Sequence, residues 1–233
     1  LAIRAEDKSK VFGAALATLT ATYSGFVNQD TTASLDSPVS LTTTATASSN
    51  AGSYPITASG AADANYTISF EAGTLTVSKA ALTIRADDRS KVYGAALPSL
   101  TVSYTGFVSP DTEASLDSPV SLTTTATATS PAGSYPITAS GATDANYTIT
   151  FEAGTLTVSK AALTIRAEDQ SKVYGTAVLA LTASYSGFIN GDSAASLDNP
   201  VSLTTTATAS SNVGSYPITA SSASDVNYTI SFE

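Results

Sequence analysis

Apolar and polar residues alternate in short runs along the whole chain, which is the pattern of β-strands with one buried face. Between residues 82 and 162 the first such run is Leu82–Ala86 and the second is Leu100–Thr105. The segment Asp87–Ser90 between them predicts a polar turn, and Lys91–Gly94 predicts a short strand or bend.

The middle of the same stretch predicts a turn followed by a strand. Asp111 follows Pro110 and is a candidate cap for a single helical turn. Val120 and Leu122 then begin a threonine-rich run, which predicts a strand over 120–128.

The last third of the stretch predicts the end of one folding unit. The run Tyr135–Ala139 carries Pro136, which has no N–H for a ladder and therefore predicts an edge strand or a bulge. Alternation over 147–151 and 156–158 flanks Glu152-Ala153-Gly154 and predicts a closing hairpin. Six or seven short strands in about 80 residues favour a small β-sandwich or a β-grasp-like sheet.

The whole pattern occurs three times at a constant interval. Ile-Arg-Ala stands at Ile3, Ile84 and Ile165, and the sequence predicts three tandem all-β repeats at 1–81, 82–162 and 163–233. All eighteen aromatic residues recur in register, which indicates a reused core and not a single site. They are Phe12, Tyr93 and Tyr174; Tyr23, Tyr104 and Tyr185; Phe26, Phe107 and Phe188; Tyr54, Tyr135 and Tyr216; Tyr66, Tyr147 and Tyr228; Phe70, Phe151 and Phe232.

The junction between repeats is short. Only Ser159-Lys160-Ala161-Ala162 separates the apolar pattern that ends in Val158 from the one that begins at Leu163. No Gly, Pro or acidic run supplies a flexible hinge. We therefore predict an elongated rod of roughly 100–130 Å, taking about 30 Å for each compact unit and some elongation.

The third copy is shorter than the others. It stops at Glu233 and lacks the equivalent of Gly154–Val158, so one strand is missing and an apolar sheet edge is left uncovered. Two interpretations remain open: the chain is cut from a longer array, or a neighbouring molecule supplies the strand by β-augmentation.

Composition removes several classes of function. The chain has no Cys, His, Met or Trp, so disulfides, the usual zinc, copper and haem ligands, and a histidine general base are missing. The net charge is −9 and no basic residues cluster, which argues against nucleic acid and anionic membranes as partners. No apolar run is long enough for a membrane span. We predict no enzyme activity and no cofactor.

Pairs of carboxylates recur at one turn of each repeat. They are Glu6-Asp7, Asp87-Asp88 and Glu168-Asp169, and they are weak calcium candidates because calcium prefers oxygen ligands. No Asp-x-Asp-x-Asp-Gly loop accompanies them, so an ordinary polar turn is the simpler interpretation.

Other recurring residues have both a chemical and a plain interpretation. Asn65, Asn146 and Asn227 head Asn-x-Thr sequons, but Asn also holds turns before strands. A Lys–Asn crosslink between these asparagines and Lys10, Lys91 and Lys172 is a further hypothesis. The threonine runs are either O-glycosylated or half-exposed strands.

Four motifs of the second copy together resemble one known family. They are Leu-Thr-Ile-Arg-Ala-Asp-Asp-Arg-Ser-Lys-Val-Tyr-Gly from Leu82, Ser-Tyr-Thr-Gly-Phe from Ser103, Gly-Ser-Tyr-Pro-Ile-Thr from Gly133 and Asn-Tyr-Thr-Ile-Thr-Phe-Glu-Ala-Gly-Thr-Leu-Thr-Val from Asn146. The set resembles the MBG repeat family, whose modules occur in arrays in large bacterial surface and secreted proteins, including haemagglutinin-like adhesins. The resemblance covers the whole chain and carries over no catalytic or ligand-binding residues.

The resemblance and the repeat pattern lead to one expectation of function. We expect a structural segment of an extracellular or cell-surface bacterial protein, a rigid stalk or fibre module. Its expected partners are neighbouring copies of the same repeat, up to a homopolymeric fibre. The alternative is a multivalent adhesive module with one weak glycan- or protein-binding site in each repeat.

Overall fold

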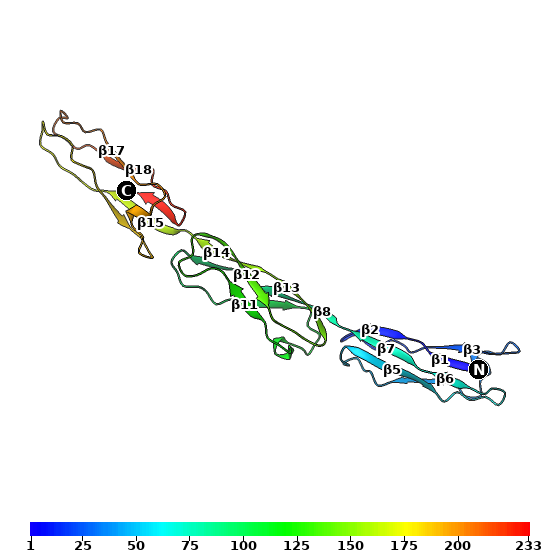
Figure 1. Cartoon of the computed structure of the whole chain (residues 1–233). Coiled ribbons are helices and arrows are strands. Elements are labelled where there is room, and N and C mark those ends of the chain that lie inside the picture. Colours follow the sequence, from blue (N-terminus) through cyan, green and yellow to red (C-terminus); the bar gives the residue numbers. More distant parts are fainter. The chain divides into compact units, whose positions relative to one another are not determined.

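The computed structural model describes all residues, 1–233, and consists of strands, turns and three single turns of 3-10 helix (Figure 1). The first repeat holds β1 (Ala2–Ala5), β2 (Lys8–Val11), β3 (Ala21–Ser24), β4 (Ser40–Thr43), β5 (Gly52–Ser59), β6 (Ser69–Glu71) and β7 (Gly73–Ser78). The second holds β8 (Ala80–Ala86), β9 (Arg89–Val92), β10 (Val102–Thr105), β11 (Ser121–Thr124), β12 (Gly133–Ser140), β13 (Tyr147–Glu152) and β14 (Gly154–Ser159). The third holds β15 (Ala161–Ala167), β16 (Ala183–Ser186), β17 (Ser202–Thr205), β18 (Ile218–Ser221) and β19 (Tyr228–Phe232). The all-β prediction is confirmed.

Contacts divide the chain into two compact units that do not coincide with the repeats. The first comprises Leu1–Arg85, Val102–Ser121 and Ala139–Glu152. The second comprises Ala86–Thr101, Leu122–Thr138 and Ala153–Glu233. Each unit therefore contains one complete junction between consecutive repeats.

The first repeat, in the first unit, is built from two sheets. One has the order β3-β1-β6 and the other β2-β7-β5-β4. Ala5 of β1 packs in one buried cluster with Ile56 of β5 and Leu75 of β7, so the two sheets share a core. Of the two expected arrangements, two sheets about one core correspond to the sandwich. The only helix in the repeat is the single turn Thr32–Ser34.

Two long segments of the first repeat run side by side in the same direction: one holds β1 and β2, the other β6 and β7. β1 pairs in parallel with β6, and β2 pairs in parallel with β7 (Figure 1). Ile3 lies opposite Phe70 and Lys10 opposite Val77, so both ladders have the same sequence offset. The two segments thus cross together from one sheet to the other without losing register.

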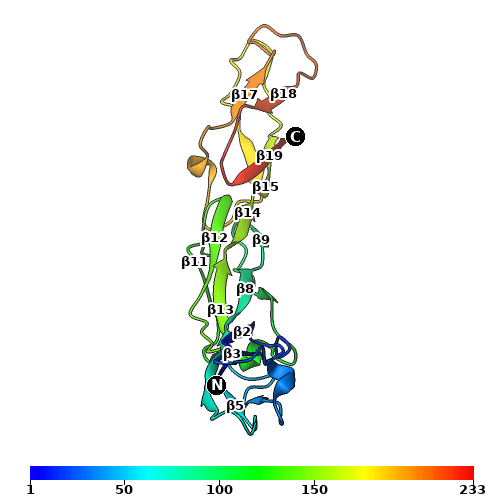
Figure 2. The same ribbon diagram turned by 90° about the vertical axis from the view of Figure 1, so that its right-hand side faces the viewer.

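The predicted closing hairpin is therefore wrong. In the second repeat β13 pairs with β8 (Figure 2), whereas β14 pairs with β12 and β9. Alternation over 147–158 correctly indicated two strands, but Glu152–Gly154 lets the chain change sheets and does not reverse it. In parallel sheets neighbouring strands are distant in sequence, and a local pattern does not contain that information.

Glycine stands at the crossing because another backbone passes close to it. A Cβ added to Gly73 would lie 2.5 Å from the carbonyl oxygen of Ala5, and one added to Gly154 would meet the carbonyl oxygen of Ala86. Neither glycine has a positive φ, so each is needed for the close approach of another backbone and not for a left-handed turn conformation. Next to the crossing, Asp7 Oδ1 accepts the N–H of Thr74 at 2.8 Å.

Two further expectations for the second repeat need correction. The helical turn, Glu113–Ser115, is capped by Thr112, whose N–H donates to the Ser115 hydroxyl at 3.1 Å, and not by Asp111. The threonine-rich strand is only four residues long, β11. Its continuation bends away, and the Thr124 hydroxyl accepts the N–H of Ala126 at 3.3 Å.

The proline of each GSYPIT motif was expected on an edge strand or at a bulge. In the first two repeats it lies in an inner strand, at a position paired on one side only. The order β11-β12-β14-β9 puts Pro136 between two strands and not on an edge strand. In the first repeat β4 pairs with Ile56–Ser59 and β7 with Gly52–Ile56, so Pro55 has a partner on the β7 side only. The missing N–H is tolerated because the ladder with β4 has already ended.

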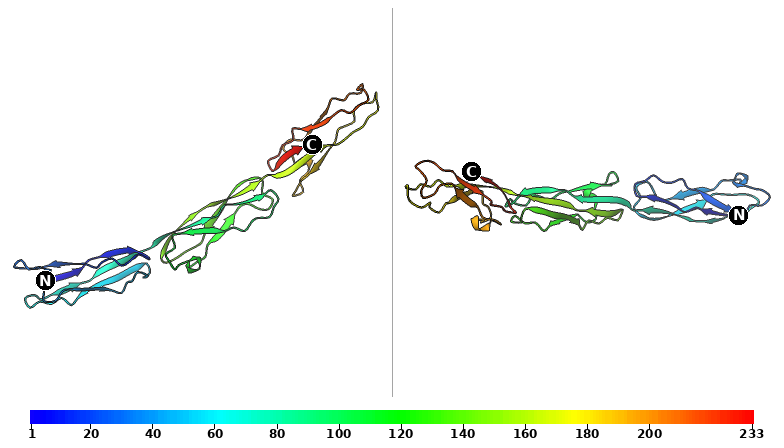
Figure 3. Two further views of the ribbon diagram at one scale, coloured as in Figure 1. Left: turned by 180° about the vertical axis from the view of Figure 1, so that it is seen from behind. Right: turned by 90° about the horizontal axis from the view of Figure 1, so that it is seen from above.

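The third repeat, in the second unit, keeps one complete sheet. β15 lies between β16 and β19 and is parallel to β19, again with the same sequence offset (Figure 3). The second sheet is reduced to β17 and β18. The structure contains no helix with the length and the apolar composition of a membrane-spanning segment.

The glycine at the crossing is testable by substitution. We expect Gly73→Ala to lower the free energy of unfolding by about 1–3 kcal/mol, because its methyl group would collide with the main chain at Ala5. The control is Gly214→Ala, since nothing lies within 4 Å of the added Cβ there. Urea unfolding measures both; equal stability of the two variants would contradict the role given to Gly73.

Candidate functional site

The residues where consecutive repeats meet make the same set of hydrogen bonds and aromatic contacts at both junctions. We call these junctions joint A, between repeats 1 and 2 in the first unit, and joint B, between repeats 2 and 3 in the second. A single residue separates the strands at each joint: Lys79 between β7 and β8, and Lys160 between β14 and β15. Lys79 Nζ donates to the carbonyl of Asp144 at 3.0 Å, and Lys160 Nζ to that of Asp225 at 2.9 Å.

An asparagine of the later repeat binds the main chain of the earlier one at both joints. Asn146 Oδ1 accepts the N–H of Ala51, and Asn227 Oδ1 accepts that of Ala132, each at 2.9 Å. The carbonyl of Asn146 also accepts the N–H of Ala80 at 2.9 Å. These are the sequon asparagines, for which the sequence alone indicated a turn, a glycan or a crosslink to lysine, and not a bond to the preceding repeat.

An aromatic pair packs across each joint. Phe12 meets Tyr147 edge to face, with ring centroids 5.6 Å apart and planes at 79°. Tyr93 meets Tyr228 in the same way, at 5.7 Å and 84°. Edge-to-face pairs add about 0.5–1.5 kcal/mol beyond the area that they bury.

Burial of these aromatic residues depends on the neighbouring repeat. Tyr93 at joint B is 7% exposed, whereas Tyr174, the same position in the third repeat, has neither a following repeat nor an equivalent of β14 beside it and is 64% exposed. Tyr147 and Tyr228 are 2% exposed, whereas the equivalent Tyr66 of the first repeat is only half-buried. The aromatic set predicted to be the core of each repeat therefore also serves the joints.

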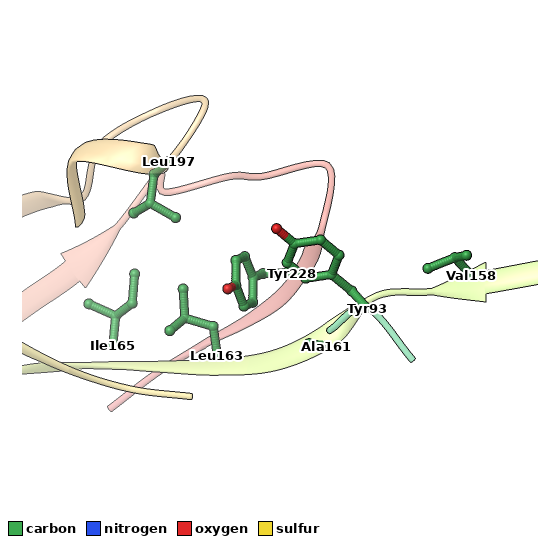
Figure 4. Close-up of a cluster of buried hydrophobic side chains, with 7 residues drawn as sticks. All are labelled: Tyr93, Val158, Ala161, Leu163, Ile165, Leu197 and Tyr228. Atoms are coloured by element: carbon green, nitrogen blue, oxygen red, sulfur yellow. The ribbon is translucent and has the colours of Figure 1, made fainter. Parts of the chain in front are cut away.

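The core of joint B continues from one repeat into the next. Tyr93 and Val158 of the second repeat belong to one buried cluster with Leu163, Ile165, Leu197 and Tyr228 of the third (Figure 4). Gly94 has φ +78° and lies so close to Ile189 that an added Cβ would be 2.5 Å from its Cδ1. Gly13 packs in the same way against Val108 at joint A.

The two buried tyrosines hold their protons more tightly than usual. Burial raises the pKa of Tyr147 to about 12, and the neighbouring carboxylate of Asp111 adds to the effect. The pKa of Tyr228 is raised to about 12 in the same way, with Asp192 as its neighbour. Each hydroxyl donates to its aspartate at 2.7 Å, which ties the turn before the 3-10 helix to the joint.

The calcium candidates of the first two repeats lie at the crossing between sheets and are engaged by protein groups. Glu6 accepts bonds from Thr20 and Lys8, which lower its pKa, and Asp7 accepts the N–H of Thr74. In the second repeat Asp87 accepts from Thr101 and Asp88 from Thr155. In the third repeat Glu168 accepts from Thr182, whereas Asp169 lines a groove. No group of three or more acidic side chains gathers. Calcium binding stays a prediction.

The recurring lysines bind main-chain carbonyls. Lys10 Nζ donates to the carbonyls of Ala14 and Ala47 at 2.9 and 2.7 Å, and Lys91 makes the equivalent pair of bonds. Both lysines are 7% exposed. Lys172 donates to the carbonyl of Ala209 at 3.2 Å. The bonds of these lysines thus organise the loops after β2 and β4, and the Lys–Asn crosslink stays a prediction.

One protein-family model matches the chain three times in tandem. The model of the MBG domain, YGX type, matches residues 1–76, 82–157 and 163–233, and the chain belongs to this family. Tyr93-Gly94-Ala95, which fits the YGX of that description, lies at joint B. No curated protein matches the chain.

The asparagine bond is testable with a control that the chain itself supplies. We expect Asn146→Ala and Asn227→Ala each to lower the free energy of unfolding by about 1 kcal/mol, because one hydrogen bond is lost and the half-buried N–H of Ala51 or Ala132 is left without an acceptor. Asn65→Ala changes the equivalent residue of the first repeat, which does not bind another repeat in this chain, and should leave the free energy of unfolding nearly unchanged. Urea unfolding that ranks the three variants equally would contradict the joint role.

The raised pKa values predict a loss of stability at high pH. Because the folded-state pKa of Tyr147 and Tyr228 is about 12 and the ordinary value is 10.0, their contribution is fully present below pH 10 and disappears as the pH rises through about 12. Urea unfolding across this range should show that the free energy of unfolding decreases with pH, and that it decreases less in the double variant Tyr147→Phe/Tyr228→Phe. The control is Tyr216→Phe, outside the joints, whose free energy of unfolding should decrease as much as that of the unchanged chain.

Proposed function

We propose that the chain is a rigid stalk or fibre module, built to hold its two ends apart. The observation that carries the proposal is the joint: one residue between strands, an asparagine bond to the preceding repeat and an aromatic pair that the neighbour buries. Bending at such a joint would expose Tyr93 and Tyr228 and break the hydrogen bond. A stalk needs this resistance, since flexible linkers let domains reorient freely.

The proposed location is the bacterial cell surface or the extracellular space. MBG repeats are structural repeats typical of bacterial surface proteins, and this chain carries three of them in tandem. Stability comes from packing and strand pairing without disulfides, since there is no cysteine. In this proposal the role is mechanical, and no repeat acts as an enzyme.

The partners we propose are neighbouring repeats of the same kind. Within the chain they meet at joints A and B. Beyond it, an unpaired strand donated to the third repeat would link subunits into a fibre by β-augmentation. The adhesive alternative, a weak glycan or protein site in each repeat, stays a prediction that glycan-array binding rising steeply with repeat number would support.

Electron microscopy of single molecules tests the stalk proposal. We expect rods of roughly 100–130 Å with a narrow distribution of lengths, as three compact repeats in line require. A variant with four Gly-Ser residues inserted after Lys79 and after Lys160 serves as the flexible control and should show a broad distribution. The unchanged chain behaving like this control would contradict the proposal.

Melting of single and tandem repeats gives an independent test. Because stability in repeat arrays adds up from units and their interfaces, residues 82–162 alone should melt at a lower temperature than they do within the chain. Calorimetry measures both. Equal melting temperatures would show that the joints do not couple the repeats.

A further inference from the structure

The turn over residues 189–192 at joint B carries the single Asn-Gly pair of the sequence, Asn190-Gly191. The N–H of Asp192 donates to the carbonyl of Ile189 at 2.9 Å, and φ is 56° at Asn190 and 82° at Gly191. Positive φ at both central residues is the geometry of a type I′ turn, which asparagine and glycine adopt with the least strain. The pair therefore fits its place in the fold.

Both residues of the pair are open to solvent. Asn190 and Gly191 are exposed, and nothing lies within 4 Å of a Cβ added to Gly191. No main-chain carbonyl accepts the N–H of Gly191. The nitrogen of Gly191 is thus free to react, and no side chain of its own blocks its approach to the amide of Asn190.

The same turn is bound to the tyrosine pair of joint B. Asp192 accepts the hydroxyl protons of Tyr228 at 2.7 Å and of Tyr93 at 3.1 Å, the edge-to-face pair of Figure 4. The N–H of Ile189 donates to the hydroxyl of Tyr228 at 3.0 Å. A change in the length or the charge of the turn therefore acts directly on the groups that hold the joint.

We propose that Asn190 is a site of spontaneous deamidation, with water as the reactant, and that this modification loosens joint B. The main-chain nitrogen of Gly191 gives its proton to hydroxide and attacks Cγ of Asn190. The N–Cγ bond forms, the Cγ–Nδ2 bond breaks, and Nδ2 takes a proton from water and leaves as ammonia, which produces a succinimide ring. Water then opens the ring at either carbonyl and gives aspartate or isoaspartate.

Both products disturb the turn. Each adds a negative charge two residues before Asp192, and like charges this close repel each other. Isoaspartate also carries the main chain through the former Cβ, which lengthens the turn by one carbon atom. The packing of Ile189 on Gly94 and the bond between Ile189 and Asp192 depend on the length of the turn. We therefore expect a weaker joint B after the reaction.

The equivalent turns of the other repeats lack this reactive pair. Joint A has Ser109-Pro110, with no side-chain amide to lose and no N–H to attack with. The first repeat has Asn28-Gln29, where φ is also positive at both residues, 54° and 68°. Its turn is alike, but a glutamine side chain takes the place of a hydrogen atom. The site is thus specific to joint B, and it does not depend on the proposed stalk role.

Hydroxylamine tests the chemistry, because it cleaves the main chain where a succinimide forms. We expect the folded full chain to give fragments 1–190 and 191–233. Mass spectrometry of chain incubated at mildly alkaline pH should show exchange of ammonia for water at 190–191, faster as the pH rises. Gly191→Gln, which copies the turn of the first repeat, should slow the reaction by about tenfold or more, which corresponds to about 1.4 kcal/mol in the barrier.

Hydrogen exchange of the fresh and the incubated chain measures the effect on the joint. The amides of Ala132 and Ile189, both donors at joint B, should exchange several times faster once Asn190 is modified, because the joint opens more often. The equivalent amides of Ala51 and Val108 at joint A should be unchanged. Incubated Gly191→Gln should keep its protection at both joints.

Three results would overturn these expectations. Neither cleavage nor ammonia loss at 190–191 would show that the turn holds the pair in an unreactive conformation. Equal reaction rates in the unchanged chain and in Gly191→Gln would show that glycine does not make the site reactive. Full modification that leaves exchange at joint B unchanged would show that the turn does not support the joint. The rod length of freshly prepared chain is independent of all three, so the stalk proposal fails or stands separately.

Discussion

Parallel pairing between segments that lie far apart in the sequence is the constraint on which the other features of each repeat depend. β1 and β2 are held along their length by β6 and β7, and the same offset recurs between β8 and β13, β9 and β14, and β15 and β19. Because one pair of segments contributes strands to both sheets, the register between the two segments fixes how the two sheets are placed relative to each other. Glycine and aspartate at the crossing are what allow the pair to change sheets together.

The third repeat shows what the missing segment contributes. Without an equivalent of β7, the sheet of four strands shrinks to β17 and β18. The sheet around β15 persists, since its partners β16 and β19 are both present. Strand structure in 170–173 and 214–217 is thus a property of the pairing and not of the local sequence, which is nearly the same in all three copies.

The sequence predicted the strands of this fold far better than their partners. Alternation placed 82–86 and 147–151 correctly, and the constant interval between motifs indicated the repeats. The same alternation wrongly predicted a hairpin turn at Glu152–Gly154, because it indicates which face of a strand is buried and not which strand lies alongside. The joints were less visible still. Asn146 binds a residue 95 positions away in another repeat, and its local pattern is that of an ordinary turn.

The direction of the parallel pair also decides how a repeat bears tension. In the first repeat the chain enters at the start of β1 and leaves at the end of β7, and these points are at opposite ends of the paired segments. A pull on the two points slides one segment along the other and loads the ladder bonds together, in shear. Had the last two strands formed the expected hairpin, the same pull would have broken the hydrogen bonds between those two strands one after another.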